Sequence, residues 1–341
     1  MPRSRRLAVI GLATAATAVA GTASATPFEE GAAIVTGLAP AVPVGAPGVA
    51  VGAPGTRDTT PYFTIQFGRT QWVSADKLCK PLPNAVTLGR VATLLQQRGK
   101  VASGNVVVKR QGVSQSCFSN YVISPSWNDL TQLRTVYGWT FNSAGMTYAN
   151  MTTLTPTEQL AEACGSVGAL ARRGHTRAWG LFAYPNNKYS DKIQTQVVKK
   201  CFAFGRQYGD TTTTQAAGAL WPNWQTTVSV NGGRCADTTL ACSTSGASST
   251  YQTPAMLIPK TRVAAGAWTT MQWYRLVTGT STTGTVAQWN CTGAENTHWT
   301  SDAELYCVRD FLRVIDAIPS TVKVTDAATV AEAWGVKPSG T

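Results

Sequence analysis

The chain contains 341 residues, 43 % of them hydrophobic and 13 % charged, which is the composition of a folded globular protein rather than a disordered one. Its 29 Lys and Arg residues against 17 Asp and Glu residues give a formal net charge of +12, but the basic residues are scattered, so nucleic acid is not an expected partner. Only two histidines are present, which argues against a histidine-rich metal site.

The N-terminal 25 residues have the pattern of a signal peptide. An uncharged apolar run to about residue 20 follows three arginines, and Ala23-Ser24-Ala25 supplies the small residues of a cleavage site. We predict a signal peptide over residues 1–25 and a secreted protein, with both the general and the twin-arginine export routes open. No later stretch is long enough to span a bilayer, so we expect no transmembrane segment after signal removal.

Residues 26–60 are dominated by Gly, Ala, Pro and Val, and they repeat Gly-Ala-Pro-Gly at Gly45–Gly48 and Gly52–Gly55. This composition offers no periodic apolar face, so we predict a flexible leader. The folded domain is expected over residues 61–335.

From Pro61 onward, short β-prone runs alternate with helical patterns. In the first half we predict strands over 62–67, 105–108 and 139–142 and helices over 84–98 and 126–138. Thr155-Pro156-Thr157-Glu158 is a capping box with proline at the first helical position, and it predicts a helix that runs through Leu170 and stops at Gly174.

The alternation resumes in the second half. We predict strands over 178–184, 202–204, 268–277 and 322–324, and helices over 191–200, from 301 to about 318, and up to Trp334. Residues 210–265 interrupt the rhythm and read as a loop-rich, disulfide-containing insertion with one or two strands. Strand–helix alternation predicts a parallel α/β sheet or barrel, and long loops after the strands favour the barrel.

The eight cysteines all lie in the part expected to be exported, where disulfides are the default. No two of them form a C-x-x-C pair, so a zinc ribbon or thioredoxin chemistry has no support. We predict pairing between neighbours along the chain, namely Cys79–Cys117, Cys164–Cys201, Cys235–Cys242 and Cys291–Cys307.

In such barrels the functional residues follow the C-terminal ends of the strands. The stretch from Ser143 to Thr155, running into the helix with Glu158 and Glu162, resembles the second motif of the polysaccharide deacetylases of the NodB-homology type, carbohydrate esterase family 4. Residues 64–70, 182–185 and 268–277 are similar to other motifs of that family, in the same order. The resemblance covers residues 61–335 and implies a distorted (β/α) barrel.

The family uses one Asp and two His to hold zinc or another divalent ion, a second Asp as base and a late His as acid. By the resemblance, the two aspartates fall on Gly68 and Arg69, the first two histidines on Ala144 and Tyr148, and the late histidine on Tyr274. Gly and Ala offer no ligand and Arg carries a fixed positive charge. We therefore predict no metal or other cofactor and no confidently assigned catalytic residue.

Other chemistries find weaker support. His175 and His298 lack partners at metal-ligand spacing, and we interpret both as hydrogen-bonded surface or cap histidines. Asp210 and Asp237 could act as a pair of carboxylates of the kind that glycosidases use. Exposed aromatic side chains suit sugar rings, and the candidate sugar-binding residues are Arg69, Tyr148, Tyr184, Trp221, Trp224 and Tyr274.

The sequence thus predicts a secreted, monomeric, deacetylase-like protein that binds a polysaccharide or cell-wall glycan without metal-dependent deacetylation. One alternative is an active hydrolase of acetylated sugars with an atypical site. A second is a structural wall protein.

Overall fold

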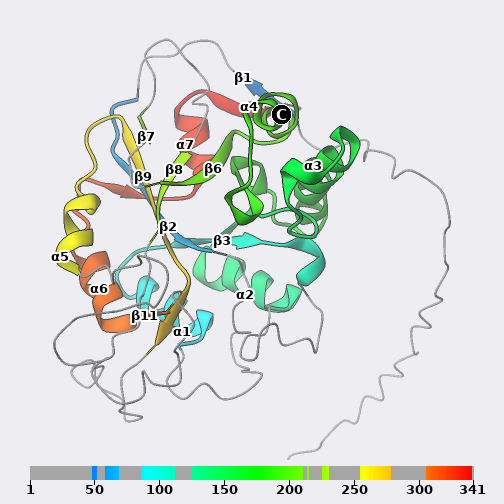
Figure 1. Cartoon of the computed structure of the whole chain (residues 1–341). Helices are drawn as coiled ribbons and strands as arrows, with labels where there is room; N and C mark the ends of the chain where they lie inside the picture. The colour runs from blue at the N-terminus through cyan, green and yellow to red at the C-terminus, as the bar shows by residue number, and fades with distance from the viewer. Residues whose placement is uncertain are drawn as a thin grey trace, which may run out of the picture. The chain divides into compact units, whose positions relative to one another are not determined.

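The computed structural model describes residues 48–51, 58–68, 86–111, 125–209, 213–214, 225–229, 254–277 and 305–339. Seven parallel strands form a closed ring in the order β2-β3-β4-β5-β6-β8-β9, and the pairing of β9 with β2 closes it (Figure 1). The predicted distorted (β/α) barrel is therefore confirmed. The strands of the ring are β2 Tyr62–Phe67, β3 Ala102–Val106, β4 Thr140–Ser143, β5 Leu181–Ala183, β6 Phe204–Gly209, β8 Gln225–Ser229 and β9 Ala267–Trp273.

Short strands supplement the ring. Near its start, β2 pairs with β12 (Lys323–Val324), whereas its end pairs with β3, so one side of β2 serves two neighbours. Antiparallel β7 (Thr213–Thr214) adds to β9. Two further pairs lie outside the ring: β10 (Arg275–Val277) with β11 (Leu305–Cys307), and β1 (Gly48–Val51) with β13 (Val336–Ser339).

Helices follow most of the strands and begin at conventional caps. Ser126 and Thr155 each form a complete capping box, with Asp129 and Glu158 respectively, and Gly138 ends its helix with a φ of 70°. The α-helices are α1 Leu88–Gln96, α2 Trp127–Tyr137, α3 Pro156–Arg172, α4 Asp191–Gln196, α5 Pro254–Leu257, α6 Val308–Asp316 and α7 Ala327–Ala333. The 3-10 turns are η1 Val108–Arg110, η2 Met151–Thr153, η3 Ala178–Gly180, η4 Pro185–Asn187, η5 Val198–Lys200 and η6 Ile258–Thr261.

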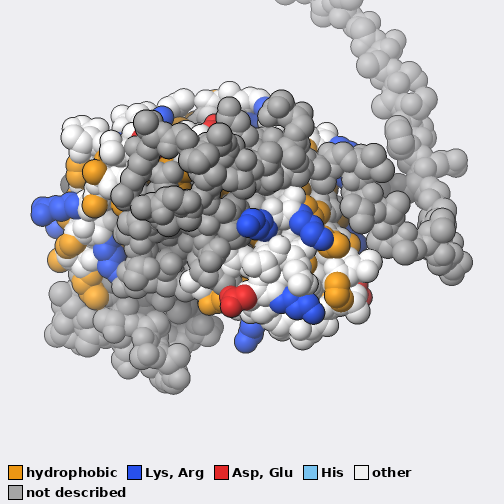
Figure 2. Space-filling view, turned by 90° about the horizontal axis from the view of Figure 1, so that it is seen from above, with side chains coloured by type: hydrophobic (Ala, Val, Ile, Leu, Met, Phe, Trp, Pro, Cys, Tyr) orange, Lys and Arg blue, Asp and Glu red, His pale blue; other side chains and the backbone are white. Residues whose placement is uncertain are grey.

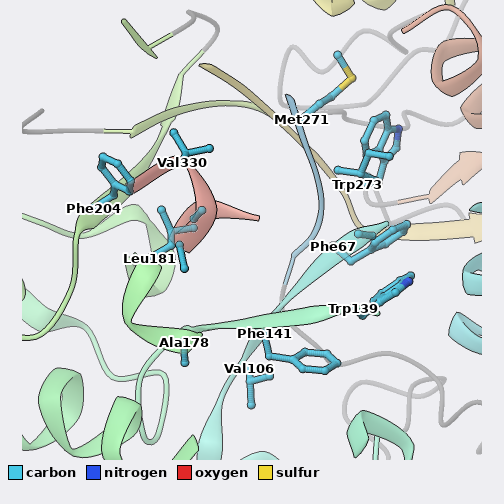
Figure 3. Packing of buried hydrophobic residues seen from close by; sticks show 14 of the residues in the cluster. Phe67, Val106, Trp139, Phe141, Ala178, Leu181, Phe204, Met271, Trp273 and Val330 are labelled. Atoms are coloured by element: carbon cyan, nitrogen blue, oxygen red, sulfur yellow. The ribbon is translucent and has the colours of Figure 1, made fainter. Parts of the chain in front are cut away.

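The apolar core is rich in aromatic rings, several of them from the barrel strands (Figure 3). Phe67 at the end of β2 stacks on Trp139 with ring centroids 5.5 Å apart, and Trp273 at the end of β9 meets Phe311 of α6 edge-on at 5.0 Å. Both strand residues are at most 1 % exposed. Aromatic pairs of this kind add to the free energy gained by burying their apolar surface.

A disulfide joins Cys164 of α3 to Cys201 after η5, which confirms that predicted pair. Cys307 is also disulfide-bonded. At least one cysteine of every other predicted pair lies outside the described residues.

The structure differs from the predicted elements in several places. Residues 210–265 contain the strands β7 and β8, in agreement with the one or two strands predicted there, but β8 belongs to the barrel ring and not to an insertion. Residues 305–307 form β11, within the helix predicted from residue 301. The strand predicted over 268–277 is two strands, because the chain leaves the ring at Tyr274 and β10 then pairs with β11. The first residues of the strand predicted over 178–184 form η3 instead.

The N-terminal predictions are mostly outside the described residues. Residues 1–47, which include the expected signal peptide, are not among them. Within the predicted leader, residues 48–51 form β1, which pairs with β13. Where the structure describes the chain, no helix is long and apolar enough to cross a membrane.

Candidate functional site

The C-terminal ends of the parallel strands bring the sequence-predicted positions to one end of the barrel. Phe67 pairs with Trp273, so the residues that follow them, Gly68 and Tyr274, are neighbours at the ends of β2 and β9. Ala144 follows β4, two strands away from β2. We call this end of the barrel the mouth.

Gly68 lies against two side chains of the mouth. Its N–H donates to the Trp273 carbonyl at 2.8 Å. A methyl group added at Gly68 would overlap the amide of Gln272 and lie 2.9 Å from Cε1 of Tyr274. The Gln272 amide therefore occupies the space that any larger residue at position 68 would need.

Below the mouth, polar side chains hydrogen-bond across the barrel interior. Asn142 Nδ2 donates to Asn105 Oδ1 at 3.3 Å, and Asn105 Nδ2 donates to Gln272 Oε1 at 3.4 Å. The Arg206 guanidinium also donates to Gln272 Oε1. Because β2 separates β3 from β9, and β8 separates β6 from β9, the two hydrogen bonds to Gln272 must pass through the interior.

These interior residues are at most 4 % exposed, so the interior is a buried polar layer. Gln66 belongs to the same layer, because it pairs with Gln272 in the register of β2 and β9. Its amide is fully buried, and neither its nitrogen nor its oxygen has a hydrogen-bond partner within the described residues. A buried amide of this kind is normally satisfied by water or by a polar group of another molecule.

The loop of residues 145–149 is held at the mouth by the buried carboxylate of Glu162. Its Oε1 accepts the backbone N–H groups of Thr147, Tyr148 and Ala149 at 2.8, 2.9 and 3.2 Å, and its Oε2 accepts the Thr147 hydroxyl at 3.0 Å. Gly145 has a φ of 91°, and a side chain there would collide with Glu162. The close approach of this loop to α3 therefore requires glycine.

Tyr148 is the aromatic residue of this loop. It is half-buried, it has a φ of 69°, and it packs on a small apolar cluster of Val107, Ala144 and Ala183. The guanidinium carbon of Arg110 lies 5.1 Å from the centre of its ring. Tyr148 and Arg110 together present an aromatic and a cationic group beside the mouth.

Two other candidate residues are buried. Tyr184 is 1 % exposed, and burial, with a smaller contribution from Tyr189, raises the pKa of its phenol above the ordinary value. It is a core residue here and offers no surface to a sugar. Tyr274 is 6 % exposed, beside Gly68.

The interpretation of His175 as a hydrogen-bonded surface histidine is wrong. The side chain is 3 % exposed, between Trp127 and Phe141, and neither ring nitrogen has a partner within the described residues. The remaining candidates lie outside the described residues, namely Arg69, Asp210, Trp221, Trp224, Asp237 and His298.

The described residues of the mouth do not fit the divalent metal that the family resemblance implies. Gly68 and Ala144 carry no donor atom, and the Gln272 amide fills the space beside Gly68. In the parts of the chain that the structure describes, no three His, Cys, Asp or Glu residues cluster as metal ligands. These residues therefore supply no set of metal ligands.

The polar layer was missed at the sequence level, although its signal was present. Thr64 and Gln66 alternate with Phe63, Ile65 and Phe67, and β9 repeats the alternation with Thr270 and Gln272. Alternation of this kind in a strand is usually assigned to one apolar and one solvent-exposed face. In β2 and β9, however, the apolar and the polar face are both buried.

Comparison with known proteins gives structural matches only. No protein-family model matches the sequence, and no curated protein matches it either. A polysaccharide deacetylase from Bacillus cereus is similar over 48 % of this chain, with 15 % identity and a TM-score of 0.35, and the match spans 45 % of that protein.

Longer matches are found with two other solved structures. A family 4 carbohydrate esterase from Streptomyces lividans is 11 % identical over 82 % of this chain and 98 % of its own, with a TM-score of 0.38. The chitin deacetylase of Colletotrichum lindemuthianum is 11 % identical over 83 % of this chain and 92 % of its own, with a TM-score of 0.42.

Proposed function

We propose that this protein is a secreted carbohydrate-binding protein whose deacetylase-like barrel does not carry out metal-dependent deacetylation. The proposal rests on which side chains line the mouth of the barrel. Gly68 and Ala144, at positions where the sequence motifs place metal ligands, have no donor atom, and the Gln272 amide fills the space beside Gly68. These residues cannot hold a metal ion that would activate a water molecule.

The groups that are present suit a neutral polyhydroxylated ligand. Tyr148 contributes a half-buried ring, the Arg110 guanidinium lies beside it, and the amides of the polar layer lie beneath. Sugar rings are bound by apolar contact with an aromatic face together with hydrogen bonds from a few fixed polar groups. We propose a polysaccharide or cell-wall glycan as the ligand class, with Arg69, Trp221 and Trp224 as further contacts.

The proposal is tested by measuring acetate release and binding on the same panel of acetylated glycans. We expect no acetate release by the mature, disulfide-intact protein, with or without chelator, and saturable binding in calorimetry. Substitution Tyr148→Ala should weaken binding at least about tenfold, the equivalent of 1.4 kcal/mol. Acetate release that chelator abolishes would overturn the loss of metal chemistry, and absence of binding to every glycan would overturn the binding function.

A gain-of-function experiment tests the motif assignment. The variant Gly68→Asp, Arg69→Asp, Ala144→His and Tyr148→His restores the donors of the family motif. Because the Gln272 amide occupies the space beside Gly68, Gln272→Ala must be added to make room. The five-fold variant should bind zinc in calorimetry, and a folded variant without zinc affinity would contradict the assignment.

A further inference from the structure

Two arginines lie close together where α2 approaches the end of α3, outside the barrel. They are Arg134 of α2 and Arg173, which follows the last residue of α3. In the described part of the chain no carboxylate lies within 4 Å of these guanidinium groups, whereas Arg98 and Arg177 each pair with an acid. Figure 2 shows that Lys and Arg side chains also exceed Asp and Glu on the face it presents.

The guanidinium of Arg173 is held by an aromatic ring. Its central carbon lies 4.1 Å from the centre of the Trp127 ring. Stacking on one face orients the planar group and leaves the N–H donors at its edge available. The contact with Trp127 therefore orders the Arg173 guanidinium without using its N–H donors.

Arg134 approaches the same place from the neighbouring helix. A methyl group added at Gly174 would lie 3.3 Å from its Nη2 atom, so this side chain packs against the residue that follows Arg173. Burial, together with the positive charges of Arg134 and Arg173, lowers the pKa of the adjacent His175 to about 4. Both guanidinium groups are thus close to one buried imidazole.

The end of α3 explains only part of this cluster. Cations are favoured at a helix C-terminus by the helix dipole, which accounts for Arg173. Arg134 belongs to a different helix, and bringing its charge beside Arg173 costs electrostatic free energy. An anion between the two guanidinium groups would offset that cost.

We propose that Arg134 and Arg173 form an anion-binding site for phosphate groups. Two guanidinium groups match the several oxygens of a phosphate with bidentate, charge-assisted hydrogen bonds. The ligand class is a phosphate-bearing anion, either free phosphate or a phosphate-bearing polymer. This site is independent of the mouth and of the proposed carbohydrate-binding function.

The test is titration of the full mature protein with inorganic phosphate and, separately, with polyphosphate, at an ionic strength held constant with sodium chloride. We expect Arg134→Gln with Arg173→Gln to weaken phosphate binding at least about tenfold, a loss typical of charge-assisted hydrogen bonds. The control, Arg90→Gln with Arg262→Gln, removes the same charge from exposed residues of other elements and should bind like the unmodified protein. Equal weakening in both variants, or binding of neither probe, would overturn the proposal.

The two probes distinguish the source of the anion. Comparable site affinity for both indicates recognition of a single phosphate group, and binding of polyphosphate alone indicates a polymer site. Should the Gln variant fail to fold, Arg134→Lys with Arg173→Lys keeps the charge but removes the planar fork, and it should still weaken phosphate binding. An affinity unchanged in the Lys variant would contradict the bidentate site.

A second readout comes from His175. An anion between the arginines should offset their effect and raise the pKa of His175, which proton NMR can follow because the chain has only two histidines. His298 is the internal reference. A His175 pKa that phosphate does not move would contradict the placement of the anion.

Discussion

The carboxylate of Glu162 fixes the backbone of Tyr148, whose N–H it accepts at 2.9 Å. Tyr148 has a φ of 69°, in the left-handed region that costs a residue with a side chain about 1–2 kcal/mol. The same carboxylate also accepts two neighbouring backbone N–H groups. One buried acid of α3 thereby holds the aromatic residue of the mouth in a conformation that it would not adopt alone.

Substitution Glu162→Gln should therefore destabilise the protein by about 1–3 kcal/mol, because the amide has one acceptor oxygen and no charge. Urea unfolding measures the loss. Glycan affinity should fall as well, since Tyr148 would no longer be held. Glu158→Gln on the same helix is the matched control: Glu158 is exposed at the helix cap, so the variant should lose less stability and keep its affinity. Equal affinity in the two variants would contradict the role of Glu162.

Substitution Gly68→Ala should also be destabilising, by about 1–3 kcal/mol, because the new methyl group overlaps Gln272. Gln272 cannot move aside without losing its hydrogen bonds to Asn105 and Arg206. Gly165→Ala in α3 is the control, since its methyl group would meet only Met146, at 3.7 Å, and alanine favours a helix. Similar unfolding midpoints for both variants would show that the mouth has room at position 68.

Removal of the disulfide by Cys164→Ala with Cys201→Ala should cost about 3–4 kcal/mol if the bond acts by restricting the unfolded chain, because it closes a loop across a sequence separation of 37 residues. The measurement is equilibrium unfolding of the variant and of the unmodified protein without reductant. A loss below about 1 kcal/mol would show that the bond contributes little to stability.

Stability should fall in acid because of His175. Its pKa is lowered to about 4 in the folded protein from an ordinary value of 6.5, so between these values the unfolded chain binds more protons than the folded one. The free energy of unfolding therefore decreases as the pH falls from about 6.5 to 4, by up to about 3 kcal/mol. Unfolding measured across this pH range checks the slope.

The control for this prediction is His175→Phe. An apolar ring fits between Trp127 and Phe141 without needing hydrogen bonds, and it cannot be protonated. The variant should lose most of the dependence on pH in this range. An unchanged slope would assign the effect to other groups.

The elements with strong local signals were predicted well from the sequence. The capping box of Thr155 and Glu158 and the glycine at position 138 set helix ends through contacts within a few residues, so they can be recognised without tertiary structure. The strand β2 was also predicted at its observed bounds. The pair Cys164–Cys201 followed from proximity along the chain.

The arrangements that depend on the barrel could not be predicted. β8 has the sequence Gln-Thr-Thr-Val-Ser, which lacks an apolar run, so a strand could be expected within residues 210–265 but not assigned to the barrel. The position of Gln272 beside Gly68 requires the register between β2 and β9, which no local pattern specifies. The Glu162 contacts bring together residues 13 to 15 positions apart, and the helix pattern alone does not show that the carboxylate points toward the loop.

Closure of the ring has a consequence for how the protein can meet a partner. Each of the seven strands of the ring is paired with a neighbour on both sides. A sheet with an open edge can accept an added strand from another chain, and this is a common route to peptide capture and to aggregation. The ring itself offers no such edge, so the barrel is protected against growth into a continuous sheet.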